Sequence, residues 1–154
     1  MLSVSITISG DKETIEKLGK LGQSFLNFQL AMRSIGKELT GYFANQVFAS
    51  QGGALSQRWP QLANSTKVDK AKHYPGAGIL VRTGEMKNSF DFYQPDVNSV
   101  IIGNNAPYFV YHQSSAPRHK LPRRVMMSTG GNVKSIVANI IDADVKDKLL
   151  KAGL

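Results

Sequence analysis

The sequence of 154 residues contains no cysteine and no apolar run that approaches the length of a membrane span. The absence of cysteine excludes disulfide bonds and thiolate metal ligands, and it fits synthesis in the cytoplasm. A transmembrane helix needs about 20 consecutive apolar residues, so we expect no span and no membrane partner. Residues 1–10 alternate apolar and polar side chains, which predicts a first β-strand rather than a signal peptide.

Acidic residues are scarce: the chain has 11 aspartates and glutamates against 19 lysines and arginines, for a net charge of +8. This balance favours an acidic partner, which is a nucleic acid, an anionic surface or an acidic protein. Residues 51–130 hold few of the carboxylates that a metal-dependent nuclease would need, namely Asp69, Glu85, Asp91 and Asp96.

Catalytic and cofactor motifs are also missing. The three histidines, His73, His112 and His119, lack the close spacing of common zinc sites. No serine stands in a G-x-S-x-G context, and the glycines fit neither a P-loop nor a dinucleotide fingerprint. The sequence therefore predicts a protein that is not an enzyme and that carries no cofactor and no metal.

A long amphipathic stretch runs from Thr14 to Ala49. Large apolar residues recur in it at steps of three and four, which places them on one stripe of a helix: Leu18, Leu21, Phe25, Phe28, Met32, Ile35, Leu39 and Tyr42. We expect one long helix or two collinear ones, with a break near Gly19–Gly22 because glycine costs about 1 kcal/mol in a helix interior. Phe28, Met32 and Ile35 lie mid-stripe and are expected to be buried. The stripe packs on the chain's own sheet or, in part, on neighbouring subunits.

The remainder predicts a single α+β domain over residues 1–154, with the long N-terminal helix and a C-terminal helix packed on a small antiparallel sheet. Residues 55–78 show no period and predict one long loop. Residues 88–93 and 97–102 predict a hairpin, residues 107–113 a short helix, and residues 114–122 a second long loop. Asn132 is expected to cap a final helix, whose apolar face is Val133, Ile136, Val137, Ile140, Ile141, Val145 and Leu149.

Both loops contain candidate contact residues. Trp59, which follows Arg58, is either an interface anchor or a plug at the edge of the core. Basic residues crowd the segment 118–124, which contains Arg118, Lys120, Arg123 and Arg124. These cations contact phosphates or an acidic protein surface, or they form a solvated loop. A sequence-independent DNA-binding module that uses this loop is the alternative function, and a steep salt dependence of duplex affinity would identify it.

Four stretches together resemble the phage virion morphogenesis, or tail-completion, family of tailed bacteriophages. Phe48 through Leu62 is similar to the family's helix, glycine-containing loop and W-x-x-L. Residues 79–89, ILVRTGEMKNS, resemble L-x-x-T-G-x-L-x-x-S. Residues 100–103 with Tyr108 through Gln113 resemble the I-G and Y-A-x-x-H-Q block, and residues 121–126, LPRRVM, resemble I-P-A-R-P-F.

The resemblance implies a structural protein that completes the tail or joins head and tail at the neck, as a cyclic homo-oligomer that is expected to be a hexamer. Its implied partners are other copies, neighbouring neck, connector or tail proteins, and DNA that passes through the ring. It implies a structural role for the His112–Gln113 pair. It also implies that Arg124, which aligns with the family's arginine, is partly buried and hydrogen-bonded to backbone or a carboxylate, while Arg118 and Lys120 are exposed.

Overall fold

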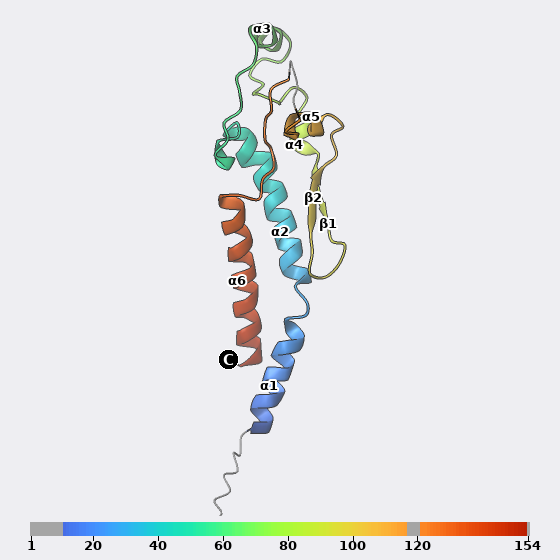
Figure 1. The fold of residues 1–154 in the computed structure, drawn as a ribbon, viewed down its shortest axis with the longest axis vertical. Coiled ribbons are helices and arrows are strands. Elements are labelled where there is room, and N and C mark those ends of the chain that lie inside the picture. The colour runs from blue at the N-terminus through green and yellow to red at the C-terminus, as the bar shows by residue number, and fades with distance from the viewer. Residues whose placement is uncertain (1–10, 117–120, 154) are drawn as a thin grey trace, which may run out of the picture.

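The computed structural model describes residues 11–116 and 121–153, and three helices set the long axis of the molecule (Figure 1). Helix α1 (Asp11–Ser24) is followed end to end by α2 (Gln29–Gly41), which continues into a π-helical segment, η1 (Tyr42–Val47). Helix α6 (Asn132–Ala152) runs back along both α2 and α1. The strand expected in residues 1–10 lies outside the described residues.

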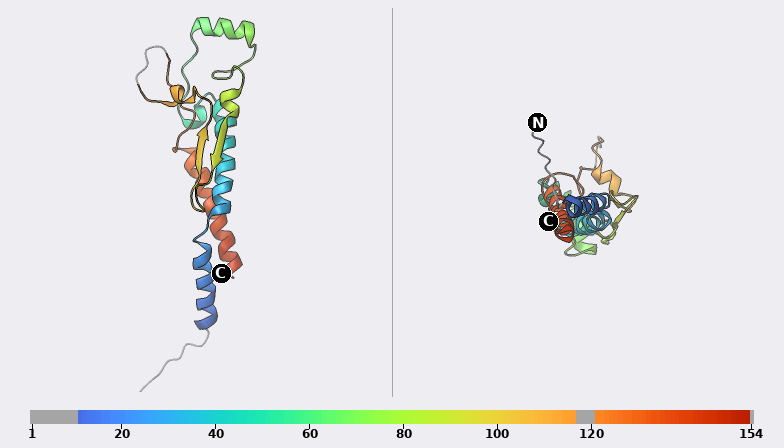
Figure 2. Two further views of the ribbon diagram at one scale, coloured as in Figure 1. Left: turned by 90° about the vertical axis from the view of Figure 1, so that its right-hand side faces the viewer. Right: turned by 90° about the horizontal axis from the view of Figure 1, so that it is seen from below.

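A two-stranded antiparallel sheet packs against α2 (Figure 2). Strand β1 (Phe90–Tyr93) pairs with β2 (Ile101–Asn104), and Phe90 lies opposite Asn104. Short helices α4 (Glu85–Asn88) and α5 (Phe109–Gln113) flank the sheet, and a 3-10 turn, η2 (Gly53–Leu55), follows η1. The α+β class with a long N-terminal helical region, a C-terminal helix and a small antiparallel sheet is confirmed.

The hydrophobic core sits where η1 meets the sheet, in the upper half of the molecule in Figure 1. Phe43 and Phe48 both pack on Phe90, with ring centroids 6.0 and 6.2 Å apart. Met126 and Val47 are completely buried there. Aromatic pairs at such separations add to the stabilisation from buried area, so the core holds the upper end of the helices firmly to the sheet.

The apolar stripe is buried only along part of its length. Ile35 is buried as expected, but Phe28 and Met32 are only partly buried, and Leu18 is 53% exposed. The ammonium group of Lys148 covers the Phe28 ring at 3.6 Å from its centroid. The expectation of full burial was wrong for Phe28 and Met32, because α1 and the start of α2 extend away from the core.

The helix break lies at residues 25–28 and not near Gly19–Gly22, which are inside α1. The side chain of Asn98 holds the break: its Oδ1 accepts from the Phe28 N–H at 3.0 Å, and its Nδ2 donates to the Leu26 carbonyl at 3.1 Å. Lys148 Nζ donates to the Asn27 carbonyl at 2.7 Å. Backbone groups that would be unsatisfied at a break therefore find distant partners, which local composition cannot indicate.

The stretch 55–78, expected as a loop, contains helix α3 (Asn64–His73). None of the residues of α3 is buried. Since an amphipathic period reflects burial of one face, a helix that buries no face leaves no such period in the sequence. The helix lies at the end of the molecule opposite α1 (Figure 1).

Two glycines in the α2 region offer a matched test of the packing between helix and sheet. A Cβ built on Gly36 would lie 2.6 Å from Cγ of Phe92, whereas one on Gly41 would meet nothing within 4 Å. We expect Gly36→Ala to destabilise the fold by about 1–3 kcal/mol through this overpacking. Gly41→Ala should instead stabilise it by about 0.5–1 kcal/mol, through helix propensity. Urea denaturation of both variants checks this, and equal effects would contradict the close contact of α2 with β1.

Candidate functional site

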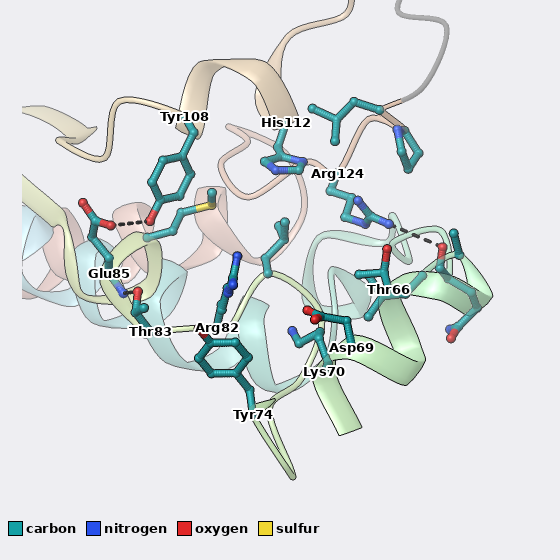
Figure 3. Close-up of a pocket in the computed structure, with 18 residues that line it drawn as sticks. Thr66, Asp69, Lys70, Tyr74, Arg82, Thr83, Glu85, Tyr108, His112 and Arg124 are labelled. Atoms are coloured by element: carbon teal, nitrogen blue, oxygen red, sulfur yellow. Dashed lines mark hydrogen bonds between the residues drawn. The ribbon is translucent and has the colours of Figure 1, made fainter. Parts of the chain in front are cut away.

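A cavity of about 830 Å³ opens between α3, α4 and α5 (Figure 3). Its lining comes from residues 61–74, 80–86, 108–112 and 121–124. Each of the four stretches that carry the family resemblance contributes to this lining, through Leu62, Thr83, Tyr108 and Arg124 among others. Segments far apart in the sequence therefore meet at one place, which makes this cavity the candidate site.

Arg124 is a buried cation in the cavity wall, with 4% of its surface exposed. Its Nε and Nη2 donate to the Pro60 carbonyl at 3.2 and 3.0 Å. Its Nη2 also donates to the Gln61 carbonyl at 3.4 Å, the dashed line from Arg124 in Figure 3. Burial lowers the pKa of the Arg124 guanidinium from its ordinary value. Arginine nevertheless remains charged at neutral pH, so the site holds a fixed positive charge. The expected bonding of Arg124 to backbone is confirmed, and its burial is more complete than the partial burial expected.

Lys70 and Arg82 bring two further cations to the cavity. Lys70 Nζ donates to the Gly78 carbonyl and, at 3.0 Å, to the Val81 carbonyl. Desolvation by burial lowers the pKa of the Lys70 ammonium from its ordinary value, and the charges of Arg82 and Arg124 lower it further. The Arg82 guanidinium lies over the Tyr74 ring, 4.7 Å from its centroid.

Two carboxylates line the same cavity, and each has a partner of its own. Asp69 Oδ1 lies 2.9 Å from Nδ1 of His73. Glu85 Oε2 accepts from the Tyr108 hydroxyl at 2.6 Å, and this bond raises the pKa of the Tyr108 phenol. Within the described residues, neither carboxylate forms an ion pair with any of the three cavity cations. The arrangement therefore suits an anionic group from another molecule.

Trp59 belongs to the core rather than to the surface. Only 3% of it is exposed, and its indole Nε1 donates to the Val125 carbonyl at 2.7 Å. Its ring packs edge-on against Phe48, with centroids 5.2 Å apart. Of the two interpretations of this tryptophan, the core one agrees with the structure and the interface anchor does not, because the ring is already enclosed by its own chain.

Gln113 joins α5 to the segment that precedes α6. Its Oε1 accepts from the N–H groups of Met126 and Met127 at 2.9 and 3.2 Å, and its Nε2 donates to the Met127 carbonyl at 2.7 Å. The N–H of Arg124 donates to the His112 carbonyl at 2.9 Å. The pair therefore positions the chain that carries Arg124, in agreement with the structural role that the resemblance implied.

The structure separates the members of the basic segment. Arg123 is exposed, and its Nε donates to the Gln113 carbonyl at 3.1 Å. Arg118 and Lys120 lie outside the described residues. Arg58 is exposed beside a shallow hollow at residues 49–56. Contacts of these four residues with another molecule remain predictions.

Sequence reasoning missed the cavity residues Lys70, Tyr74 and Arg82. Lys70 and Tyr74 lie in or directly after α3, where the absence of an apolar period favoured a loop, and Arg82 carries no motif of its own. These residues can be identified only from the structure. Their positive charges come together because Lys70 on α3 bonds to the carbonyls of Gly78 and Val81, close to Arg82 and Arg124.

Across residues 11–116 and 121–153, histidines and carboxylates form no group of three or more that could hold a metal ion. No helix in this part of the chain has both the length and the apolar character needed to cross a membrane.

Comparison with known proteins found one family. The model of the phage virion morphogenesis family matches residues 11–146. No curated protein and no solved structure matches the chain.

Proposed function

The chain belongs to the phage virion morphogenesis family, which gives it a role in phage virion assembly. From this premise we propose a non-enzymatic structural protein that completes the tail or joins head and tail at the neck. In this proposal, copies of the chain form a closed ring at the neck or the upper end of the tail. The six-fold number rests on the family resemblance alone. The protein is located in the virion and, during assembly, in the host cytoplasm.

Exposed apolar side chains along α1 and the start of α2 carry the ring proposal. Ile15 and Leu18 on α1 and Leu26 and Leu30 near the break are 53–76% exposed, and Leu150 on α6 is 75% exposed. Large apolar side chains that gather on one part of a surface mark sites of protein association. In a ring the contacts are heterologous, so this region meets a different face of the next copy, and the rotation closes.

The cationic cavity supports contacts with acidic neighbours. Lys70, Arg82 and Arg124 present positive charge there, and the chain as a whole carries +8. A carboxylate of a neighbouring neck, connector or tail protein would form charge-assisted hydrogen bonds with these donors. DNA that passes through the ring is the alternative partner, and it would meet the loop 118–124, where Arg123 is exposed.

The native mass of the purified protein tests the ring. We expect a cyclic oligomer, either alone or after addition of its neck partners, in sedimentation or native mass spectrometry. A protein that stays monomeric in both conditions would contradict this proposal. Tight binding to free duplex DNA that weakens steeply with salt, without any ring, would favour the DNA-binding alternative.

A further inference from the structure

An apolar groove runs between α2, α6 and residues 98–102. Its volume is about 950 Å³, and most of its walls are aliphatic. Nine apolar side chains larger than alanine line it, from α2, the β2 region and α6: Met32, Ile35, Leu39, Val100, Ile102, Val133, Val137, Ile141 and Val145. Six of these are only partly buried, so the groove leaves apolar surface open to solvent.

The sequence of residues 1–10 has the complementary pattern. Leu2, Val4, Ile6 and Ile8 alternate with serine and threonine, so an extended chain presents all four on one side. In an extended chain the six steps from Leu2 to Ile8 cover about 20 Å. The groove follows α6 from Val133 to Val145, twelve helical steps, or about 18 Å. Length and chemistry therefore match.

A chain cannot place all four of these side chains in its own groove, because Ile8 lies too close to Asp11 to reach it. The Gly153 end of α6 lies beside Lys17, because a Cβ on Gly153 would be 3.9 Å from Lys17 Cε. Val145 is eight residues above Gly153, and Asp11 is six residues below Lys17, so Asp11 and the near end of the groove are about 20 Å apart along the helices. The three steps from Ile8 to Asp11 span at most about 11 Å. The distance to the far end of the groove, at Val133, is longer still.

We propose that the groove receives residues 2–8 of a second copy of this chain, with Leu2, Val4, Ile6 and Ile8 packed onto α2 and α6. The proposal rests on the proposed function, because it names the contact that links successive copies of the ring. It is a heterologous contact, in which the N-terminal segment of one copy meets the α2–α6 groove of the next. Repetition around the ring covers every groove.

The lack of cysteine makes this contact directly measurable. We would prepare two full-length variants, Ile6→Cys and Ala138→Cys, where Ala138 lines the groove and is exposed. The two proteins are mixed and oxidised, and the mixed disulfide is quantified on a denaturing gel. A disulfide requires Cα atoms about 4.4–6.8 Å apart, so its formation reports proximity. A matched control replaces Ala138→Cys with Ala143→Cys, an exposed position on α6 that does not line the groove.

We expect at least tenfold more mixed disulfide for Ala138→Cys than for Ala143→Cys, and a synthetic peptide of residues 1–10 should suppress it. Equal yields at the two positions would overturn the proposal. The double variant Ile6→Cys/Ala138→Cys tests whether the groove instead holds the N-terminal segment of the same chain. An intramolecular disulfide in a monomer, with no disulfide between mixed chains, would also overturn the proposal. The native mass of the same samples distinguishes failure of this contact from failure of the proposed function. A ring that forms without the disulfide would contradict only the groove contact, whereas a protein that stays monomeric would contradict the ring as well.

Discussion

Replacement of Trp59 with alanine is expected to lower the free energy of unfolding by about 3–5 kcal/mol, since a large buried ring is lost and a cavity remains. The ring is 97% buried by its own chain, where it contacts Phe48 and bonds to the Val125 carbonyl. The chain reverses tightly beneath it: Gly52 has a φ of +83°, and a Cβ there would lie 2.6 Å from Cδ1 of Trp59. No other residue fits this turn as glycine does.

Urea denaturation followed by far-UV circular dichroism measures this loss, since the variant has no tryptophan left to report by fluorescence. Trp59→Phe is the control, because it keeps an aromatic ring and loses the N–H. It should cost about 1–3 kcal/mol, the penalty of leaving the Val125 carbonyl without its donor. A change below about 1 kcal/mol for Trp59→Ala would show that the tryptophan is not a core residue and would restore its interpretation as a surface anchor.

Arg124→Ala is expected to lower the free energy of unfolding by about 2–3 kcal/mol, because hydrogen bonds from a charged donor to two carbonyls are lost. These bonds connect the segment before α6 to the loop after Trp59, over more than 60 residues of sequence. The variant should also assemble poorly, since the cavity loses its buried charge and its wall loses support. Thermal and urea denaturation measure the stability, and particle assembly measures the second effect.

Its neighbour Arg123 provides the matched control for Arg124. Arg123 is exposed and makes one bond, to the Gln113 carbonyl, so Arg123→Ala should cost at most about 1 kcal/mol. For Arg118 and Lys120, which lie outside the described residues, the expectation from the sequence stands. Their double substitution should leave the fold intact and weaken only contacts with an acidic neighbour or DNA. If Arg124→Ala is silent while this double variant unfolds the protein, the roles assigned to these residues are reversed.

The sequence by itself indicated the helical regions, the hairpin and the final helix. Burial of one face of a helix or strand leaves a period of 3.6 or 2 in the apolar residues. Motif order was enough to suggest the family, and it also suggested the burial of Arg124, which the structure confirms. The same period led to an overestimate of the burial of Phe28 and Met32. It shows which face of the helix is apolar, but it does not show how much of that face other segments cover.

Contacts between distant segments set where the long helix breaks, which residues form the cavity and what covers Trp59. The break depends on Asn98 and Lys148, which are 70 or more residues away in sequence, and local glycine content gave the wrong place. Helix α3 buries none of its residues and therefore left no pattern, although it brings Lys70 toward Arg82 and Arg124. The sequence around Trp59 is consistent with a buried or an exposed ring. The contacts of the ring with Gly52 and the Val125 carbonyl show that it is buried. Periodicity records local burial, whereas these features depend on contacts between distant segments, which only the folded chain brings together.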